Sequence, residues 1–284
     1  MADKVTAPMV RARKGGAKLK MVTAYDTPSA RIADRAGADI ILVGDSLANV
    51  VLGFETTLKV GVEEMVHHTA AVSRARPRAL VVGDMPFLSY HVSVEEAVRH
   101  AGRFVRDGGA EAVKLEGGRK RIPVVEAILA AEIPVMGHIG LTPQSVNAMG
   151  GYRVQGKDLE AARALLADAR ALDAAGVFAL VLEGVPDTLA GVITGAVSVP
   201  TIGIGAGGAV DGQVLVFHDV LGFHDQHLAK FVRCYAHLFD DAVTALAAFF
   251  ADVESGAFPS ADESYTMPEE AARALLAGGS ESGG

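Results

Sequence analysis

The chain has 284 residues, 50% of them hydrophobic and 21% charged, which excludes a disordered or fibrous protein and leaves enough apolar material for a large core. Its formal net charge of −8 at pH 7 argues against nucleic acid and anionic membrane surfaces as partners. With a single cysteine, Cys234, no disulfide can form within the chain. No signal peptide and no membrane-spanning apolar run are found, so we expect a cytoplasmic protein without a membrane partner.

Short apolar runs alternate with longer segments of helical period over most of the chain. Strands are expected at residues 19–24, 39–43, 79–82, 111–115, 133–136, 178–182, 201–204 and 214–217. Helices are expected up to residue 36 and at 62–74, 94–106, 122–130, 159–175 and 188–196, with a weak seventh helix. A long helix at 228–252, which includes Cys234, is expected to close the fold.

This order of elements indicates one domain. Runs that are apolar without strict alternation are typical of strands buried on both faces of a parallel sheet. Eight of them favour an α/β fold of the TIM (β/α)8 barrel type over an open doubly wound sheet. We expect a single barrel domain over residues 1–258, with a loose basic N-terminal arm. Residues 259–284 should form a tail that is partly disordered, above all at 278–284.

Polar side chains follow one apolar run after another, at the point where each predicted strand ends. In a barrel these positions form the carboxyl-end rim on which active sites are built. Taken singly, an Asp here can be a helix N-cap, a Glu can stabilise a helix start, and a His can be a hydrogen-bonded core residue. Six successive strand ends of this kind argue for an active site instead. The candidate residues are Asp45, Ser46, Asp84, Lys114, Glu116, His138 and Glu183.

Three of these residues, Asp45, Asp84 and Glu116, predict a site for a divalent cation. They come from consecutive strands, and unpaired carboxylates brought together would repel one another. Ligation by oxygen alone with few protein contacts suits Mg²⁺. A 2-oxo acid could chelate such an ion through its carboxylate and keto oxygens, and the ion would then stabilise the enolate.

Three further residues complete the chemistry that we expect at this rim. Lys114 is two residues before Glu116, so both side chains point to the same face of the strand, where the lysine could bind an anionic substrate. Glu183 ends an otherwise apolar run and is the candidate general base. His138 is the candidate hydrogen-bond donor or proton relay for the enolate.

The strings that contain these residues resemble those of the ketopantoate hydroxymethyltransferase family. The matches run in order over roughly residues 8–258. They are TAYD (23–26), GDS (44–46), GDMPF (83–87), VKLEGG (113–118), GHIGLTPQS (137–145), GGYRVQG (150–156), IGIGAG (202–207) and DGQVLV (211–216).

The resemblance implies a barrel of the phosphoenolpyruvate mutase-like type. It also implies transfer of a one-carbon unit from 5,10-methylenetetrahydrofolate to 3-methyl-2-oxobutanoate, which gives 2-dehydropantoate in pantothenate biosynthesis. Carboxylates matching Asp45, Asp84 and Glu116 would hold Mg²⁺, the last through water. Residues matching Ser46 and Lys114 would hold the substrate, and Glu183 would accept the proton. The resemblance further implies a homodecamer.

Two other functions compete with this hypothesis. The first is a C–C or C–P lyase of 2-oxo acids on the same barrel. Such enzymes usually carry a Cys- or Lys-containing gating segment on a rim loop, whereas the only cysteine of this chain comes late in the sequence. The second is a non-catalytic barrel that senses a metabolite or serves as a scaffold. That function predicts that at least one of the candidate carboxylates has been replaced. All four are present: Asp45, Asp84, Glu116 and Glu183.

Overall fold

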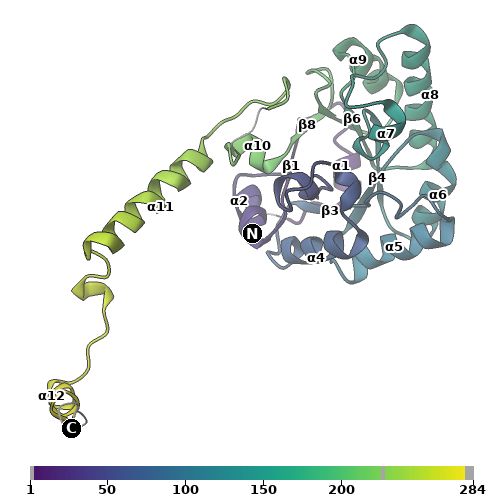
Figure 1. Ribbon diagram of the computed structural model, residues 1–284. Coiled ribbons are helices and arrows are strands. Elements are labelled where there is room, and N and C mark those ends of the chain that lie inside the picture. Colours follow the sequence, from purple (N-terminus) through teal and green to yellow (C-terminus); the bar gives the residue numbers. More distant parts are fainter. Residues whose placement is uncertain (1–2, 225–227, 279–284) are drawn as a thin grey trace. The chain divides into compact units, whose positions relative to one another are not determined.

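The computed structural model describes residues 3–224 and 228–278. Its centre is a closed barrel of eight parallel strands that follow one another in sequence order, with helices around it (Figure 1). The TIM-barrel prediction is therefore confirmed. The strands are β1 (Leu19–Thr23), β2 (Ile40–Val43), β3 (Leu80–Asp84), β4 (Ala112–Glu116), β5 (Val135–Gly140), β6 (Ala179–Glu183), β7 (Thr201–Ile204) and β8 (Gly212–Leu215).

A helix follows each of the first six strands and covers the outside of the barrel. Residues 205–211, all of them described, form a turn between β7 and β8 where a weak seventh helix was expected. Among the helices that the described residues form, none is both long and apolar enough to cross a membrane. The covering helices are α2 (Thr27–Arg35), α4 (Val62–Ser73), α5 (Val94–Arg106), α6 (Ile122–Ala130), α8 (Leu159–Ala175) and α9 (Asp187–Ala196), and the shorter ones are α3 (Leu47–Val50), α7 (Val146–Met149) and α10 (Phe217–Leu221).

The alternation of side chains along each strand separates two cores. In β3, Val81 packs outward with the helices, whereas Leu80 and Val82 belong to a second apolar cluster inside the barrel. The same inward position one step further along β3 is Asp84. The inner face thus changes from apolar to polar toward the carboxyl ends of the strands, which places the candidate residues together at one end.

The opposite end of the barrel is closed by the N-terminal segment, so the prediction of a loose arm there is wrong. Val5, Ala7 and Val10 are buried in the inner apolar cluster, the last two within α1 (Ala7–Arg11). Their burial removes apolar surface from water at an end that would otherwise be open. The segment is also fastened to the turn just before β8, because the Asp211 carboxylate accepts hydrogen bonds from Lys14 Nζ and from the backbone N–H of Gly15, both at 2.9 Å.

The predicted C-terminal helix needs a correction. The expected helix at 228–252 begins only at Leu238 and ends at Ser255 (α11), so Cys234 lies outside it. A physical reason is that Tyr235 N–H donates to Val220 O, 2.8 Å away, and is not available for an intrahelical bond. A further helix, α12 (Glu269–Gly278), forms within the predicted tail. Residues 279–284 of the tail predicted to be disordered lie outside the described residues.

Internal contacts divide the chain into two units, residues 1–236 and 237–284. The first unit contains the barrel with α1 and α10. The second contains α11 and α12, and all residues of α11 are described and none of them is buried. A domain boundary at residue 258 stays a prediction.

Candidate active site

A cavity of ≈ 490 Å³ opens at the carboxyl ends of the strands. Its wall contains every residue that the sequence singled out for chemistry. Other lining residues come from the segments beyond the strands, among them Asn49 in α3, Thr57 in a short 3-10 helix and Tyr152 in a loop. The predicted residues in the wall are Asp45, Ser46, Asp84, Lys114, Glu116, His138 and Glu183.

The parallel register of the sheet brings these side chains into contact. Asp84 in β3 is the direct partner of Lys114 in β4. Glu116 in β4 is likewise the partner of His138 in β5. Because parallel partners lie side by side and point to the same face, the pairing alone builds a row of charged groups along the inner rim.

Lys114 is the cationic centre of this row. Its Nζ lies 2.8 Å from Asp84 Oδ1 and 3.9 Å from Glu116 Oε1, and all three side chains are almost fully buried. Burial by itself would lower the pKa of Lys114, but the surrounding carboxylates outweigh it and raise the pKa. The ammonium group is therefore charged at neutral pH and able to bind an anion.

One positive charge does not compensate for three buried carboxylates. Burial raises the pKa of Asp45 well above its ordinary value, and the negative charges of Asp84 and Glu116 raise it further. Burial also raises the pKa of Asp84, although Lys114 opposes this. Such a cluster favours a bound cation, because a second positive charge would relieve the repulsion.

The chemistry of these carboxylate oxygens suits a hard divalent cation. Each carboxylate has one oxygen held by a protein donor: Asp45 Oδ2 by Gln144 Nε2, Asp84 Oδ2 by Asp45 N and Glu116 Oε2 by Gln144 N. The second oxygens of Asp84 and Glu116 are buried beside positively charged or ionisable groups: Asp84 Oδ1 lies 2.8 Å from Lys114 Nζ, and Glu116 Oε1 lies 3.4 Å from His138 Nδ1.

The three carboxylates do not by themselves form a complete metal site. In residues 3–224 and 228–278, no group of three or more His, Cys, Asp or Glu side chains is arranged as one that could hold a metal ion. A hard cation such as Mg²⁺ commonly keeps several water ligands and takes only one or two carboxylates from the protein. Direct ligation by Asp45 and Asp84 stays a prediction, as does a water-mediated role for Glu116.

His138 connects this cluster to Glu183. Its Nδ1 is 3.4 Å from Glu116 Oε1 and 3.2 Å from Lys114 Nζ, and its Nε2 is 3.3 Å from Glu183 Oε2. Burial and the Lys114 charge lower the pKa of His138, but the two carboxylates raise it to about 9. The ring lies between the carboxylate cluster and the candidate base, where a proton relay is expected.

Ser46 lies at the mouth of the same cavity, at the start of α3. Its Oγ is 2.9 Å from the hydroxyl oxygen of Tyr25, which is buried beneath it. Burial raises the pKa of Tyr25, so the phenol stays neutral and can donate to the serine. Ser46 is thus held in place by its neighbour and can offer its own proton to a ligand.

Two functional residues escaped the sequence analysis, Gln144 and Tyr90. Gln144 lies in a short turn, residues 143–145, and Tyr90 in the loop after β3. Both side chains are buried against the carboxylates, and Tyr90 Oη donates to Gln144 Oε1 at 2.5 Å. Reasoning from strand ends could not find them. A signal was present, because Gln144 belongs to the string at 137–145 that carries the family resemblance.

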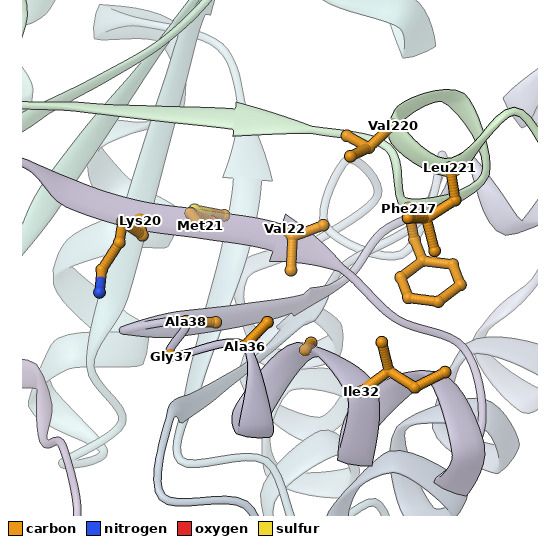
Figure 2. A pocket seen from close by; sticks show the side chains of 11 residues that line it. Lys20, Met21, Val22, Ile32, Ala36, Gly37, Ala38, Phe217, Val220 and Leu221 are labelled. Carbon is orange, nitrogen blue, oxygen red and sulfur yellow. The ribbon is translucent and has the colours of Figure 1, made fainter. Parts of the chain in front are cut away.

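A second cavity, of ≈ 230 Å³, lies outside the barrel between β1, α2 and α10 (Figure 2). Apart from Lys20, its lining residues are apolar or glycine. Figure 2 shows Phe217, Val220 and Leu221 of α10 above Ile32 of α2, with the Lys20 ammonium at the far end. This lining offers no acid–base pair, so we place the chemistry in the cavity at the strand ends.

Solved structures resemble the chain in fold. A phosphonopyruvate hydrolase in complex with oxalate and Mg²⁺ matches with a TM-score of 0.59 and 13% identity, covering 91% of this chain and 93% of that one. A 2,3-dimethylmalate lyase of the phosphoenolpyruvate mutase/isocitrate lyase superfamily matches with a TM-score of 0.58 and 18% identity, covering 97% and 96%. These similarities show a common barrel fold.

Sequence relatives are much closer. The 3-methyl-2-oxobutanoate hydroxymethyltransferase of Syntrophobacter fumaroxidans is 54% identical over 97% of this chain and 98% of its own length. The enzyme of the same name from Syntrophomonas wolfei is 57% identical over 91% of this chain and 94% of its own length. The family model for ketopantoate hydroxymethyltransferase matches residues 4–261. The chain belongs to the ketopantoate hydroxymethyltransferase family.

Proposed function

We propose that this enzyme transfers a hydroxymethyl group from 5,10-methylenetetrahydrofolate to 3-methyl-2-oxobutanoate, giving 2-dehydropantoate. The observation that supports this proposal most directly is a series of polar side chains in contact with one another. It runs from Asp84 and Lys114 through His138 to Glu183. It combines a site for an anionic 2-oxo acid with a carboxylate base in one cavity. The named relatives, at 54% and 57% identity, support the same reaction.

The protein's first task is to bind and orient the oxo acid. Lys114 supplies positive charge for the substrate carboxylate, and Ser46 supplies a hydroxyl donor. Asp45 and Asp84 would hold Mg²⁺, and Glu116 would act on it through water. When bound, Mg²⁺ polarises the 2-oxo group and stabilises the enolate that forms from it.

The second task is to move a proton and form the carbon–carbon bond. Glu183 accepts the proton from C3 of the substrate, and His138 beside it relays charge between Glu183 and Glu116. The C3 carbon then bonds to the one-carbon unit, whose hydroxyl oxygen comes from water, and tetrahydrofolate leaves. The folate supplies the electrophilic carbon. In the bond-forming step the protein therefore has only to hold the two substrates in the right orientation.

Two properties of the protein outside the active site complete the proposal. The enzyme works in the cytoplasm, as expected from its sequence. It assembles as a homodecamer, which the family resemblance supports. The lyase alternative gains no support from the barrel likeness, because an identity of 18% shows the fold alone.

The test is exchange of the C3 proton of 3-methyl-2-oxobutanoate in D₂O, followed by NMR with Mg²⁺ and without folate. The parent should exchange rapidly, and both Glu183→Gln and Asp84→Asn should lose the exchange. Glu126→Gln, which changes an exposed carboxylate on α6, is the matched control and should keep the parent rate. A parent that exchanges with no divalent ion at all would contradict the metal-stabilised half-reaction.

A further inference from the structure

Gln144 is fully engaged with the carboxylate cluster, although it follows no strand end. Its side-chain Nε2 donates to Asp45 Oδ2 at 2.9 Å and to Met85 O at 3.0 Å. Its backbone N–H donates to Glu116 Oε2 at 3.1 Å. One residue therefore bridges two carboxylates, Asp45 just after β2 and Glu116 at the end of β4, on either side of β3.

The orientation of this amide is fixed by Tyr90. The backbone N–H of Glu116 donates to Tyr90 Oη at 3.1 Å, so the hydroxyl accepts on one side. Its single proton then goes to Gln144 Oε1, 2.5 Å away. Because Oε1 accepts this proton, the NH₂ group of the amide has to face Asp45 and Met85.

The amide is the side-chain group that meets all of these requirements at once. It provides two donors and one acceptor in a single plane, whereas a carboxylate would repel Asp45 and a hydrocarbon would leave its oxygen unbonded. Gln144 is only 4% exposed, so water cannot easily replace the lost bonds.

We propose that Gln144, oriented by Tyr90, is a positioning residue that fixes Asp45 and Glu116 so that their remaining oxygens face a divalent cation. This inference rests on the proposed function, since it assigns the cation to the same carboxylates. Asp84 is held as well, since its Oδ2 accepts from Asp45 N–H and its Oδ1 pairs with Lys114. Asp45 and Glu116 each have one oxygen fixed by Gln144, and the other oxygen is the one we assign to the cation. Loss of a group that orients metal ligands typically weakens metal affinity about 10- to 100-fold.

The experiment is a titration with Mn²⁺ alone as the probe, in which free Mn²⁺ is followed by electron paramagnetic resonance. Gln144→Met keeps the length of the side chain and the backbone bond to Glu116 but removes the amide. It should weaken Mn²⁺ binding about 10- to 100-fold. Gln213→Met is the matched control, because its amide donates to the Gly207 carbonyl in an exposed turn, and it should bind Mn²⁺ like the parent.

A purely structural role is distinguished by the melting temperature in EDTA. A structural residue would lower that temperature and leave the Mn²⁺ affinity of the folded protein unchanged. Tyr90→Phe is a second, milder variant that removes only the hydroxyl, and it decides the question if Gln144→Met does not fold. Tyr90→Phe should also weaken Mn²⁺ binding, and adding it to Gln144→Met should cause little further loss, because both act through one amide.

The possible failures can be told apart. If the parent binds Mn²⁺ and both variants bind it within about twofold of the parent, the positioning role is overturned and the proposed function stands. If the parent binds no divalent ion, the metal part of the proposed function fails, and the positioning role fails with it.

Discussion

Asp84 and Lys114 are direct partners across the β3–β4 pair, and their side chains form an ion pair of 2.8 Å that is almost completely shielded from water. The strand register fixes this contact before any substrate is present. It places an ammonium group beside a carboxylate at the point where an anionic substrate and a cation are expected to meet. This ion pair is thus built into the sheet itself.

Lys114→Met should strongly destabilise the protein. Removing one partner of a buried pair leaves a carboxylate without its counter-charge and typically costs about 3–5 kcal/mol. The measurement is urea unfolding in EDTA. Arg103→Met removes a shorter ion pair, 2.6 Å to Glu63, but on the exposed surface, and should leave the free energy of unfolding nearly unchanged. Equal effects of the two substitutions would contradict the argument from burial.

Gly140→Ala should displace the candidate base. Gly140 has φ +96°, and a Cβ there would come 2.2 Å from the backbone oxygen of Glu183, its partner in β6. The strand end must then shift, and a misplacement of about 1 Å can cost about 100-fold in rate. The loss in rate is measured as the rate of C3 proton exchange of 3-methyl-2-oxobutanoate.

Gly150→Ala is the control for the glycine argument. Its φ is also positive, +68°, but a Cβ would meet no described atom within 4 Å. It should therefore cost only the backbone strain of a left-handed residue, about 1–2 kcal/mol, and leave the exchange rate intact. A similar loss of exchange in both variants would assign the effect to strain and not to the contact with Glu183.

His91 should make stability depend on pH. Burial against the Tyr90 ring, 4.2 Å between centroids, lowers the pKa of His91 to about 4 from an ordinary 6.5, with a further contribution from Arg121. The unfolded chain therefore takes up a proton first as pH falls. The neutral His91 ring therefore contributes fully to the free energy of unfolding above pH 6.5. This contribution is lost progressively as the pH falls toward 4.

The check compares the parent with His91→Gln by urea unfolding across that range. The variant should lose less stability than the parent between pH 6.5 and pH 4. Above pH 7.5 the two proteins should differ by a constant amount, because neither ring nor amide titrates there. Parallel curves throughout the acid range would show that His91 is not the group responsible.

Val10→Ala should destabilise the barrel even though the residue belongs to the N-terminal segment. Val10 is 1% exposed within the inner apolar cluster, and truncating a buried side chain of this size costs about 1.5–3 kcal/mol. Its neighbour Met9 is 47% exposed, so Met9→Ala should change the free energy of unfolding by less than about 0.5 kcal/mol. A neutral Val10→Ala would mean that the segment is a loose arm after all.

The site was predictable from the sequence because its residues obey a simple rule of position. Asp84, Lys114, His138 and Glu183 each continue the inward-facing row of a strand whose other residues are apolar, so the strand pattern also reveals the polar end. The strands themselves were predictable because runs buried on both faces carry almost no polar residues. Their ends shifted by one to a few residues, since the pairing of neighbours and not composition sets where a strand stops.

What could not be predicted depends on contacts between distant segments. Nothing local distinguishes Gln144 from a surface glutamine, because its role comes from Tyr90 and Asp45, which are 54 and 99 residues away along the chain. The apolar residues of α1 lie in a basic stretch that resembles a solvated arm. The late start of α11 similarly follows from the bond between Tyr235 and Val220, which helical periodicity does not contain.

The fastening of the N-terminal segment to Asp211 has a consequence for how the chain is made. Lys14 and Asp211 are 197 residues apart, so at about 5–20 residues per second the ribosome delivers the second partner roughly 10–40 s after the first. Contacts of this separation form late, because closing a long loop is entropically unfavourable. Through most of translation the N-terminal segment therefore lacks this anchor, and its apolar side chains are not yet packed into a complete inner cluster.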